Sequence, residues 1–177
     1  MIGREARQLV VAMSVLCIVM PGAPSFAQPV DVWGAAAGGD LETVRGVLDA
    51  GGDPDALEPN GATPIIVAAM FGHADLVDLL IERKATLDVQ NNDGATALHV
   101  AALFGHPDAI TALLGAGAST NIRNQDGLTA LGLVRALWTD EMYALYGYLG
   151  ATFQMDLDIE RIRKTRPAVR TVLQGAD

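Results

Sequence analysis

The sequence predicts an all-α repeat solenoid, and three observations indicate it. Residues 60–73 (NGATPIIVAAMFGH) and 93–106 (DGATALHVAALFGH) align without a gap at an offset of 33 residues. The same offset continues forward to 126–131 (DGLTAL) and back to Gly39. Each unit also has the same order of elements: a turn, a short helix, a glycine and a second helix. A fixed period of this length is typical of stacked units that cannot bury their apolar faces alone.

Each unit begins with a turn. We expect the turn dipeptides to form the tips of β-turn fingers that project from the stack. They are Asn60-Gly61, Asp93-Gly94 and Asp126-Gly127. A threonine follows each dipeptide at the N-cap position of a short first helix, where its hydroxyl can accept a backbone N–H. These threonines are Thr63, Thr96 and Thr129. Gly72 and Gly105 end the first helix, since glycine enters the left-handed conformation freely.

A second, amphipathic helix follows in each unit. Its apolar residues recur at helical spacing, as in Leu76, Val77, Leu80 and Ile81. The expected second helices are 40–49, 74–83, 107–114 and 140–149. The first helices instead carry alanine pairs, Ala68-Ala69 and Ala101-Ala102. We expect these residues to be small because two helices and the next unit meet there.

The phrase Thr96-Ala-Leu-His-Val-Ala-Ala102, the Gly-His dipeptides and the Asp/Asn-Gly-x-Thr turns resemble the ankyrin repeat family. The resemblance covers nearly the whole chain after residue 27. It implies four ankyrin repeats, at about 28–59, 60–92, 93–125 and 126–158, and a shortened C-terminal capping repeat at 159–177. The family's fold is an L-shaped stack of helix-turn-helix units joined by β-turn fingers. The resemblance also implies that a partner binds on the concave side and that His73, His99 and His106 make structural hydrogen bonds between repeats.

The first 27 residues predict a secretory signal peptide. Arg4 and Arg7 precede a 12-residue apolar run, Leu9–Met20, and small residues allow cleavage after Ala27. The run is shorter than the roughly 20 residues that span a bilayer, and an uncleaved N-terminal anchor is the alternative. Cleavage would leave residues 28–177 without a cysteine, because Cys17 lies in the leader. A chain without thiols suits an oxidising compartment such as the periplasm.

Charge is distributed unevenly along the chain. Residues 28–158 carry five basic and eighteen acidic side chains, a net charge of −13. Residues 159–177 carry five basic and two acidic side chains, a net charge of +3. The negative total would repel a phosphate backbone, so no nucleic-acid partner is expected. The basic segment either caps the acidic stack or meets a partner, and both readings stay open.

The sequence offers no pattern for catalytic chemistry. It has no Gly-x-Ser-x-Gly elbow, no cysteine after residue 27 and no phosphate-binding glycine loop. His73 and His106 would stand about 10 Å apart, one repeat from each other, and a shared zinc needs bonds near 2 Å. We therefore expect no catalytic residue, no metal site, no cofactor and no enzymatic activity.

Large apolar residues recur at positions that face the concave groove in ankyrin repeats. Met70, Phe71, Leu103 and Phe104 directly precede the glycine that ends the first helix, and the fourth unit, which has no such glycine, carries Leu137 and Trp138 there. Three adjacent repeats of this kind predict an exposed, contiguous stripe for partner binding, unless the residues tuck against their neighbours. Finger residues would form a polar rim beside it, among them Gln90, Asn92, Arg123 and Gln125.

These observations together predict a non-enzymatic protein–protein interaction module, exported to the periplasm, that binds a partner protein through its concave face. The partner would be an exported enzyme that the module inhibits, protects or assists. The alternative is a small-ligand-binding or enzymatic protein whose pocket lies among Trp138, Tyr143, Tyr146 and Tyr148. A divergent last repeat that needs bulky residues to seal its core explains the same cluster. We expect a monomer, with self-association of the stripe as a third possibility.

Overall fold

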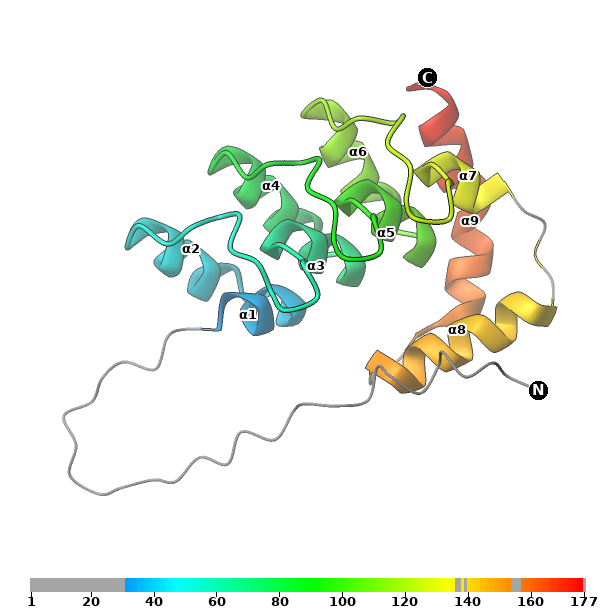
Figure 1. The fold of residues 1–177 in the computed structure, drawn as a ribbon, viewed down its shortest axis with the longest axis horizontal. Helices are drawn as coiled ribbons and strands as arrows, with labels where there is room; N and C mark the ends of the chain where they lie inside the picture. The colour runs from blue at the N-terminus through cyan, green and yellow to red at the C-terminus, as the bar shows by residue number, and fades with distance from the viewer. Residues whose placement is uncertain (1–30, 136–137, 139, 154–156, 177) are drawn as a thin grey trace.

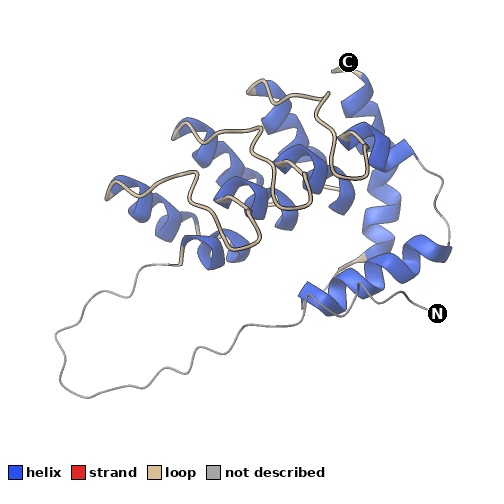
Figure 2. Ribbon diagram, viewed as in Figure 1, coloured by secondary structure: helices blue, strands red, loops and turns tan. Residues whose placement is uncertain are grey.

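The computed structural model describes residues 31–135, 138, 140–153 and 157–176. This part of the chain folds into helices joined by loops, without a strand (Figures 1 and 2). The helices are α1 (Val32–Gly38), α2 (Leu41–Asp49), α3 (Pro64–Phe71), α4 (Ala74–Glu82), α5 (Ala97–Phe104), α6 (Pro107–Gly115), α7 (Ala130–Arg135), α8 (Asp140–Phe153) and α9 (Ile159–Gln174). The predicted leader, 1–27, lies outside the described residues.

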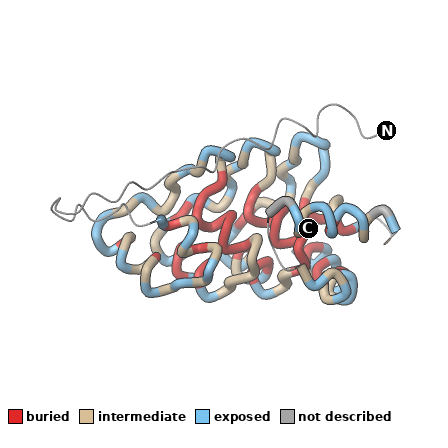
Figure 3. The backbone as a smooth tube through the Cα atoms, turned by 90° about the horizontal axis from the view of Figure 1, so that it is seen from below, coloured by how far each residue is buried: buried red, intermediate tan, exposed pale blue. Residues whose placement is uncertain are grey.

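The helices form two parallel rows, which confirms the predicted all-α repeat solenoid. The inner row consists of α1, α3, α5 and α7, each packed against the next, and α2, α4 and α6 form the outer row. Figure 3 shows the buried segments running through the middle of the stack. The alanine pairs of α3 and α5 lie there, and each of the four residues is at most 1% exposed. Their small size lets adjacent inner helices approach closely, as we expect from the sequence.

The end of the stack differs from the expected division into repeats. The segment 140–149 is helical, as part of α8, but α8 does not serve as the second helix of the fourth repeat. Instead, α9 packs against both α6 and α7, which is the place that the outer row leaves for that helix. The segment 159–177 is therefore more than a shortened fifth unit, and α9 continues without a break through Pro167. Residues 136–158 form an insertion between the two helices of one repeat.

The fingers confirm the predicted turns. Gly61, Gly94 and Gly127 all have positive φ, between 72° and 78°. Neighbouring fingers are joined by backbone hydrogen bonds: the Asn92 N–H donates to the Asn60 carbonyl and the Gln125 N–H donates to the Asp93 carbonyl, both at 3.0 Å. The 33-residue period thus continues in the hydrogen bonds that link one finger to the next.

The threonine caps follow the prediction in the third and fourth repeats. Thr129 Oγ1 accepts the Gly132 N–H at 3.1 Å. Thr96 forms a capping box with His99, in which the Thr96 N–H donates to His99 Nδ1 at 3.3 Å, and His99 Nε2 bonds the Leu128 carbonyl at 3.1 Å. Thr63 Oγ1 is buried without a hydrogen-bond partner among the described residues. Its repeat has Ile66 where the third repeat has a histidine.

The outer helices α4 and α6 are each joined by one histidine to the repeat before them. His73 Nε2 lies 2.9 Å from the Ala37 carbonyl, and His106 Nε2 lies 3.0 Å from the Met70 carbonyl. Gly72 is tightly packed against the His106 ring, so that a Cβ at Gly72 would overlap it. The structural role of these histidines, which the family resemblance implies, is therefore confirmed. A neutral imidazole must donate from Nε2 to make either bond.

The pKa of His106 predicts a pH-dependent stability. Burial, with a smaller contribution from the positive Arg161, lowers this pKa from 6.5 to about 4. The unfolded chain therefore binds a proton between pH 6.5 and 4 that the folded chain does not. We expect full stability above pH 6.5 and a loss of about 2 kcal/mol by pH 4, since water screens part of the effect.

Urea unfolding at pH 7 and pH 4.5 would measure this loss, with His106→Gln as the comparison. The variant should be less stable at pH 7 but should lose less stability on acidification. An equal loss in both proteins would show that His106 is not the responsible group.

The place of α9 predicts where core substitutions will be costly. Ile162 in α9 is 1% exposed, whereas Leu145 in α8 is 44% exposed. Ile162→Ala should lower the free energy of unfolding by about 2–5 kcal/mol, because it leaves a cavity in the stack. Leu145→Ala should change it by less than about 1 kcal/mol. Thermal or urea melts of the two variants would compare them; similar small losses would mean that α9 does not complete the fourth repeat.

Candidate functional site

The candidate site is the concave side of the stack, at the ends of the inner helices. Met70 and Phe71 end α3, and both are half-buried. The Phe71 ring lies parallel to the His73 imidazole, with 6.3 Å between the ring centroids. This stack supports one face of the Phe71 ring and fixes its direction. Part of the apolar surface of the second repeat is therefore open to a partner.

At the third repeat, the predicted stripe is covered. Leu103 is half-buried and Phe104 is only 3% exposed. The ring of Tyr146 in α8 meets Phe104 edge to face, with 6.5 Å between centroids. The Tyr146 hydroxyl also donates a hydrogen bond to the Leu103 carbonyl at 2.5 Å. The expectation of a continuous exposed stripe is thus wrong at Phe104, because a helix from later in the chain packs over it.

Trp138, which follows α7, joins the same cluster, whereas Leu137 lies outside the described residues. Trp138 is half-buried, and its ring is parallel to that of Tyr146, with 5.4 Å between centroids. The ring of Tyr143 meets Trp138 at a steep angle, also with 5.4 Å between centroids. Trp138 therefore packs against α8.

A buried arginine completes this cluster from α9. Arg166 is 6% exposed, and its guanidinium carbon lies 5.6 Å from the centre of the Trp138 ring, within the range of a cation–π contact. Its Nη2 donates to the Leu133 carbonyl at 2.5 Å, and its Nη1 donates to the Tyr146 hydroxyl at 3.4 Å. Burial raises the pKa of Tyr146, while Arg166 acts in the opposite direction. The phenol stays protonated at neutral pH and remains a donor to Leu103.

The described aromatic residues Trp138, Tyr143 and Tyr146 pack against one another. Tyr146 has no exposed surface, and its ring lies between those of Trp138 and Phe104. Tyr148, by contrast, is 56% exposed. The geometry favours the reading in which bulky residues fill the end of the core, and it gives no support to the small-ligand alternative at this place.

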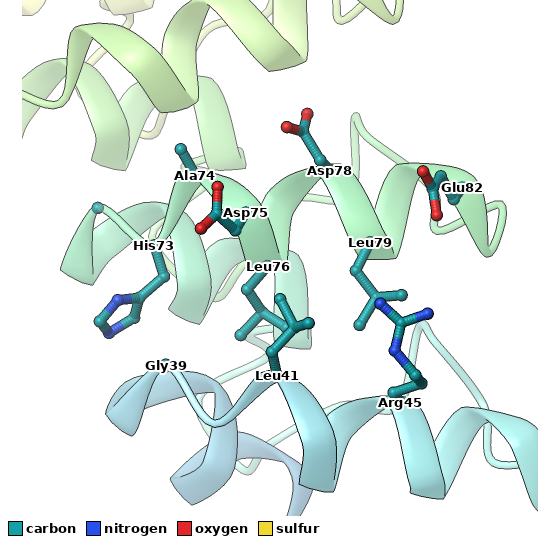
Figure 4. A pocket seen from close by; sticks show the side chains of 11 residues that line it. Gly39, Leu41, Arg45, His73, Ala74, Asp75, Leu76, Asp78, Leu79 and Glu82 are labelled. Atoms are coloured by element: carbon teal, nitrogen blue, oxygen red, sulfur yellow. The ribbon is translucent and has the colours of Figure 1, made fainter.

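A groove of about 690 Å³ lies elsewhere, between α2 and α4 of the outer row (Figure 4). Asp75, Asp78 and Glu82 come from α4, and Arg45 comes from α2 on the opposite wall. The two helices are also joined by an ion pair between Arg83 and Asp49 at 2.6 Å. Among the described residues, no group of three or more His, Cys, Asp or Glu side chains is arranged to hold a metal ion.

The predicted rim residues are exposed, but their side chains also hold the fingers together. Gln90 Nε2 donates to the Gly94 and Arg123 carbonyls, at 2.6 and 3.0 Å. Asn92 Nδ2 donates to the Pro59 carbonyl, and Gln125 Nε2 donates to the Asn92 carbonyl 33 residues earlier. Arg123 Nη1 donates to the Gly127 carbonyl at 2.7 Å. These four residues thus stiffen the edge of the concave face.

Sequence reasoning missed Arg166 and the covering role of Tyr146. The sequence did contain a signal for the buried position of Arg166. Ile162, Val169 and Leu173 follow helical spacing, and Arg166 stands in the middle of that apolar face. No comparable signal existed for Tyr146, because its partners Leu103 and Phe104 lie more than 40 residues earlier in the chain.

Comparison with known proteins gives a family match and several relatives. A family model described as ankyrin repeats (3 copies) matches residues 32–133. The chain is 38% identical over 61 residues to an ankyrin repeat-containing protein of Schizosaccharomyces pombe, which covers 34% of this chain and 30% of the relative. It is 33% identical over 92 residues to ankyrin repeat and SAM domain-containing protein 6 of Mus musculus. These residues cover 50% of this chain and 10% of the relative.

A third similar protein is cyclin-dependent kinase 4 inhibitor B of Mus musculus, which is 51% identical over 47 residues, or 27% of this chain and 35% of the relative. The chain spans about a third or less of the length of each of these relatives. The family model, in contrast, matches more than half of the chain. Because its residues are those that form the stacked helix pairs and the fingers, the chain belongs to the ankyrin repeat family.

Proposed function

We propose that this protein is a non-enzymatic module that binds a partner protein through the concave side of its second and third repeats. Ankyrin repeats are generally protein–protein interaction modules. The observation that carries the proposal is the partly exposed pair Met70 and Phe71 at the end of α3. Both side chains pack against the core but leave part of their apolar surface exposed, and partly exposed aromatic and methionine side chains are typical interface anchors.

The fingers extend this surface and make it rigid. Leu57 and Leu128 lie in the first and last described fingers and are 61% and 41% exposed. Between them, Gln90, Asn92 and Gln125 bond to backbone carbonyls of the neighbouring fingers. A surface that is already held in one arrangement loses little conformational entropy when it binds. The partner therefore meets a polar edge with one exposed leucine at each end.

The name of one relative supports a mode of action. Cyclin-dependent kinase 4 inhibitor B is described by its name as an inhibitor of a kinase. By analogy, the partner of the present protein is an enzyme whose activity, stability or maturation changes on binding. The charge of residues 28–158 favours a partner with a neutral or basic surface over an acidic one.

We also propose that the protein is exported to the periplasm of a bacterium after cleavage at Ala27. The proposal is supported by Arg4 and Arg7 before an apolar run, and by the absence of cysteine from residues 28–177. Within the described residues, no helix is both long and apolar enough to cross a membrane. N-terminal sequencing of the protein from a periplasmic fraction should begin at Gln28. A protein that keeps Met1 and sediments with membranes would instead identify an uncleaved anchor.

The binding surface can be tested with residues 28–177 as bait in a periplasmic extract. Met70→Glu/Phe71→Asp should abolish capture of the partner, because two carboxylates would be desolvated in the interface. Thr111→Asp/Asn121→Asp adds the same charge at exposed positions away from the concave face and is the matched control. Circular dichroism would establish that all baits remain folded.

A protein that the wild type and the control retain, but the concave variant loses, would support the proposal. Titration of the purified pair should then show saturable binding that weakens by at least about 100-fold in the concave variant. Equal capture by all baits would place the interface elsewhere. Failure of every bait to retain a protein would contradict the module itself.

A further inference from the structure

We propose that α8 is a latch that covers the concave face of the third and fourth repeats, and that a partner gains access to Leu103 and Phe104 when α8 swings away. This inference rests on the proposed function, because it concerns regulation of the same surface. The bound state would expose Phe104 and Trp138 beside the open pair Met70 and Phe71, and so create the three-repeat stripe that the sequence predicts.

The first argument is that α8 lies outside the stack. Figure 1 shows it leaving the two rows of helices and crossing near the start of α9. Among the α8 side chains that the structure describes, Tyr146 alone is buried, with Met142 and Leu149 half-buried on the same face. The opposite face is exposed and includes Leu145 and Tyr148. The helix is thus held from one side, and no repeat packs on the other among the described residues.

The second argument is that few bonds hold the latch closed. Tyr146 supplies the central contacts: its hydroxyl bonds Leu103, its ring stacks on Trp138 and meets Phe104. A further bond joins the Tyr143 hydroxyl to the Glu160 carboxylate of α9, but it is exposed, so water competes for it. Release of Tyr146 would therefore break the hydrogen bonds that the buried face of α8 makes and leave only the partly buried Met142 and Leu149 packed against the core.

The third argument is that α8 contains a glycine that lowers its helical stability and that close packing does not require. Gly147 lies in the middle of the helix and is exposed. A Cβ built at this position would meet nothing within 4 Å. Close packing therefore does not require glycine here, although glycine lowers the stability of a helix interior relative to alanine. An isolated helix of 14 residues is marginal in water, so α8 unwinds when it is released from the stack, and glycine at this position therefore favours the open latch.

The fourth argument is that the closed state leaves a buried donor unsatisfied. Arg166 Nε is buried and has no hydrogen-bond partner among the described residues. Among the described residues, the ion pairs join other side chains, so no carboxylate pairs with Arg166. Its guanidinium is instead contacted by the Trp138 ring, the Leu133 carbonyl and the Tyr146 hydroxyl. Opening of the latch would admit water to the guanidinium and recover part of the cost of its burial.

The site under the latch also indicates what a partner inserts there. Tyr146 places an apolar ring between Trp138 and Phe104 and a hydroxyl that donates to the Leu103 carbonyl and accepts from Arg166. A partner segment that carries a tyrosine can reproduce all of these contacts. We therefore identify the occupant of the open site as a tyrosine-bearing segment of a partner protein.

Hydrogen exchange followed by mass spectrometry tests the latch without a partner. The amides of α8 should exchange faster than those of α3 to α6, after correction for intrinsic rates. Gly147→Ala should slow exchange in α8 about five-fold and leave α3 to α6 unchanged. Tyr146→Phe keeps the ring but removes two hydrogen bonds, and it should speed exchange in α8 about ten-fold. Exchange of α8 only together with the whole stack, in all three proteins, would overturn the proposal.

A labelled peptide of residues 140–153 serves as the probe for access to the covered site. Its apparent affinity depends on the fraction of molecules with an open latch. Binding should be about five-fold weaker to Gly147→Ala and about ten-fold tighter to Tyr146→Phe than to the wild-type protein. The same peptide with phenylalanine in place of Tyr146 should bind about ten-fold more weakly to each protein. Equal affinities for all three proteins, or no binding to any of them, would overturn the latch.

The latch and the proposed function fail in different ways. Met70→Glu/Phe71→Asp lies in the second repeat, so it should abolish capture of the partner but leave peptide binding unchanged. A partner that binds the wild type, Gly147→Ala and Tyr146→Phe with one affinity would refute the latch while the module stands. Peptide binding that follows the latch variants, with no partner captured by any bait, would support the latch and refute the proposed module.

Discussion

In each of the last three repeats, a side chain at the start of the outer helix reaches a carbonyl at the end of the inner helix of the repeat before it. His73 makes this contact with Ala37, and His106 makes it with Met70. Arg161, near the start of α9, makes the corresponding contact with the carbonyls of Gly105 and Phe104, at 3.2 and 3.4 Å. The last carbonyls of a short helix lack partners within the helix, so these bonds both end the helix and connect the units.

This constraint explains how the stack tolerates an insertion. The junction requires a donor at the start of an outer helix and an apolar face behind it, and α9 supplies both with Arg161 and Ile162. It does not require that the outer helix follow its inner helix directly in the chain. A further helix, α8, can therefore stand between α7 and α9 in the chain without belonging to either row. This helix lies against the concave side and brings Tyr146 to Phe104.

The sequence was sufficient to predict the first three repeats because their signals are local. Turn glycines, helix-ending glycines and apolar spacing recur at 33 residues, and the structure places each of them as expected. The same period assigned 140–149 to the fourth repeat, since a helix of suitable apolar character occurs there. The error arose because the choice between α8 and α9 depends on long-range packing. Arg166 shows this clearly: an arginine in an apolar face has a meaning only once Leu133 and Trp138 surround it. For the same reason, the sequence could place Phe104 on the concave side but could not show what covers it.

The separation of α7 from α9 along the chain has a consequence for how the protein folds. Contacts in the first three repeats join segments that are close together in the chain, so each repeat can stack on its neighbour at a small entropic cost. The fourth inner helix instead packs against an outer helix that follows only after α8, and closing this longer loop carries an extra entropic cost. Until α9 docks, the apolar end of α6 faces water. Docking of α9 is therefore the late step of folding and the stage at which the chain is most open to aggregation.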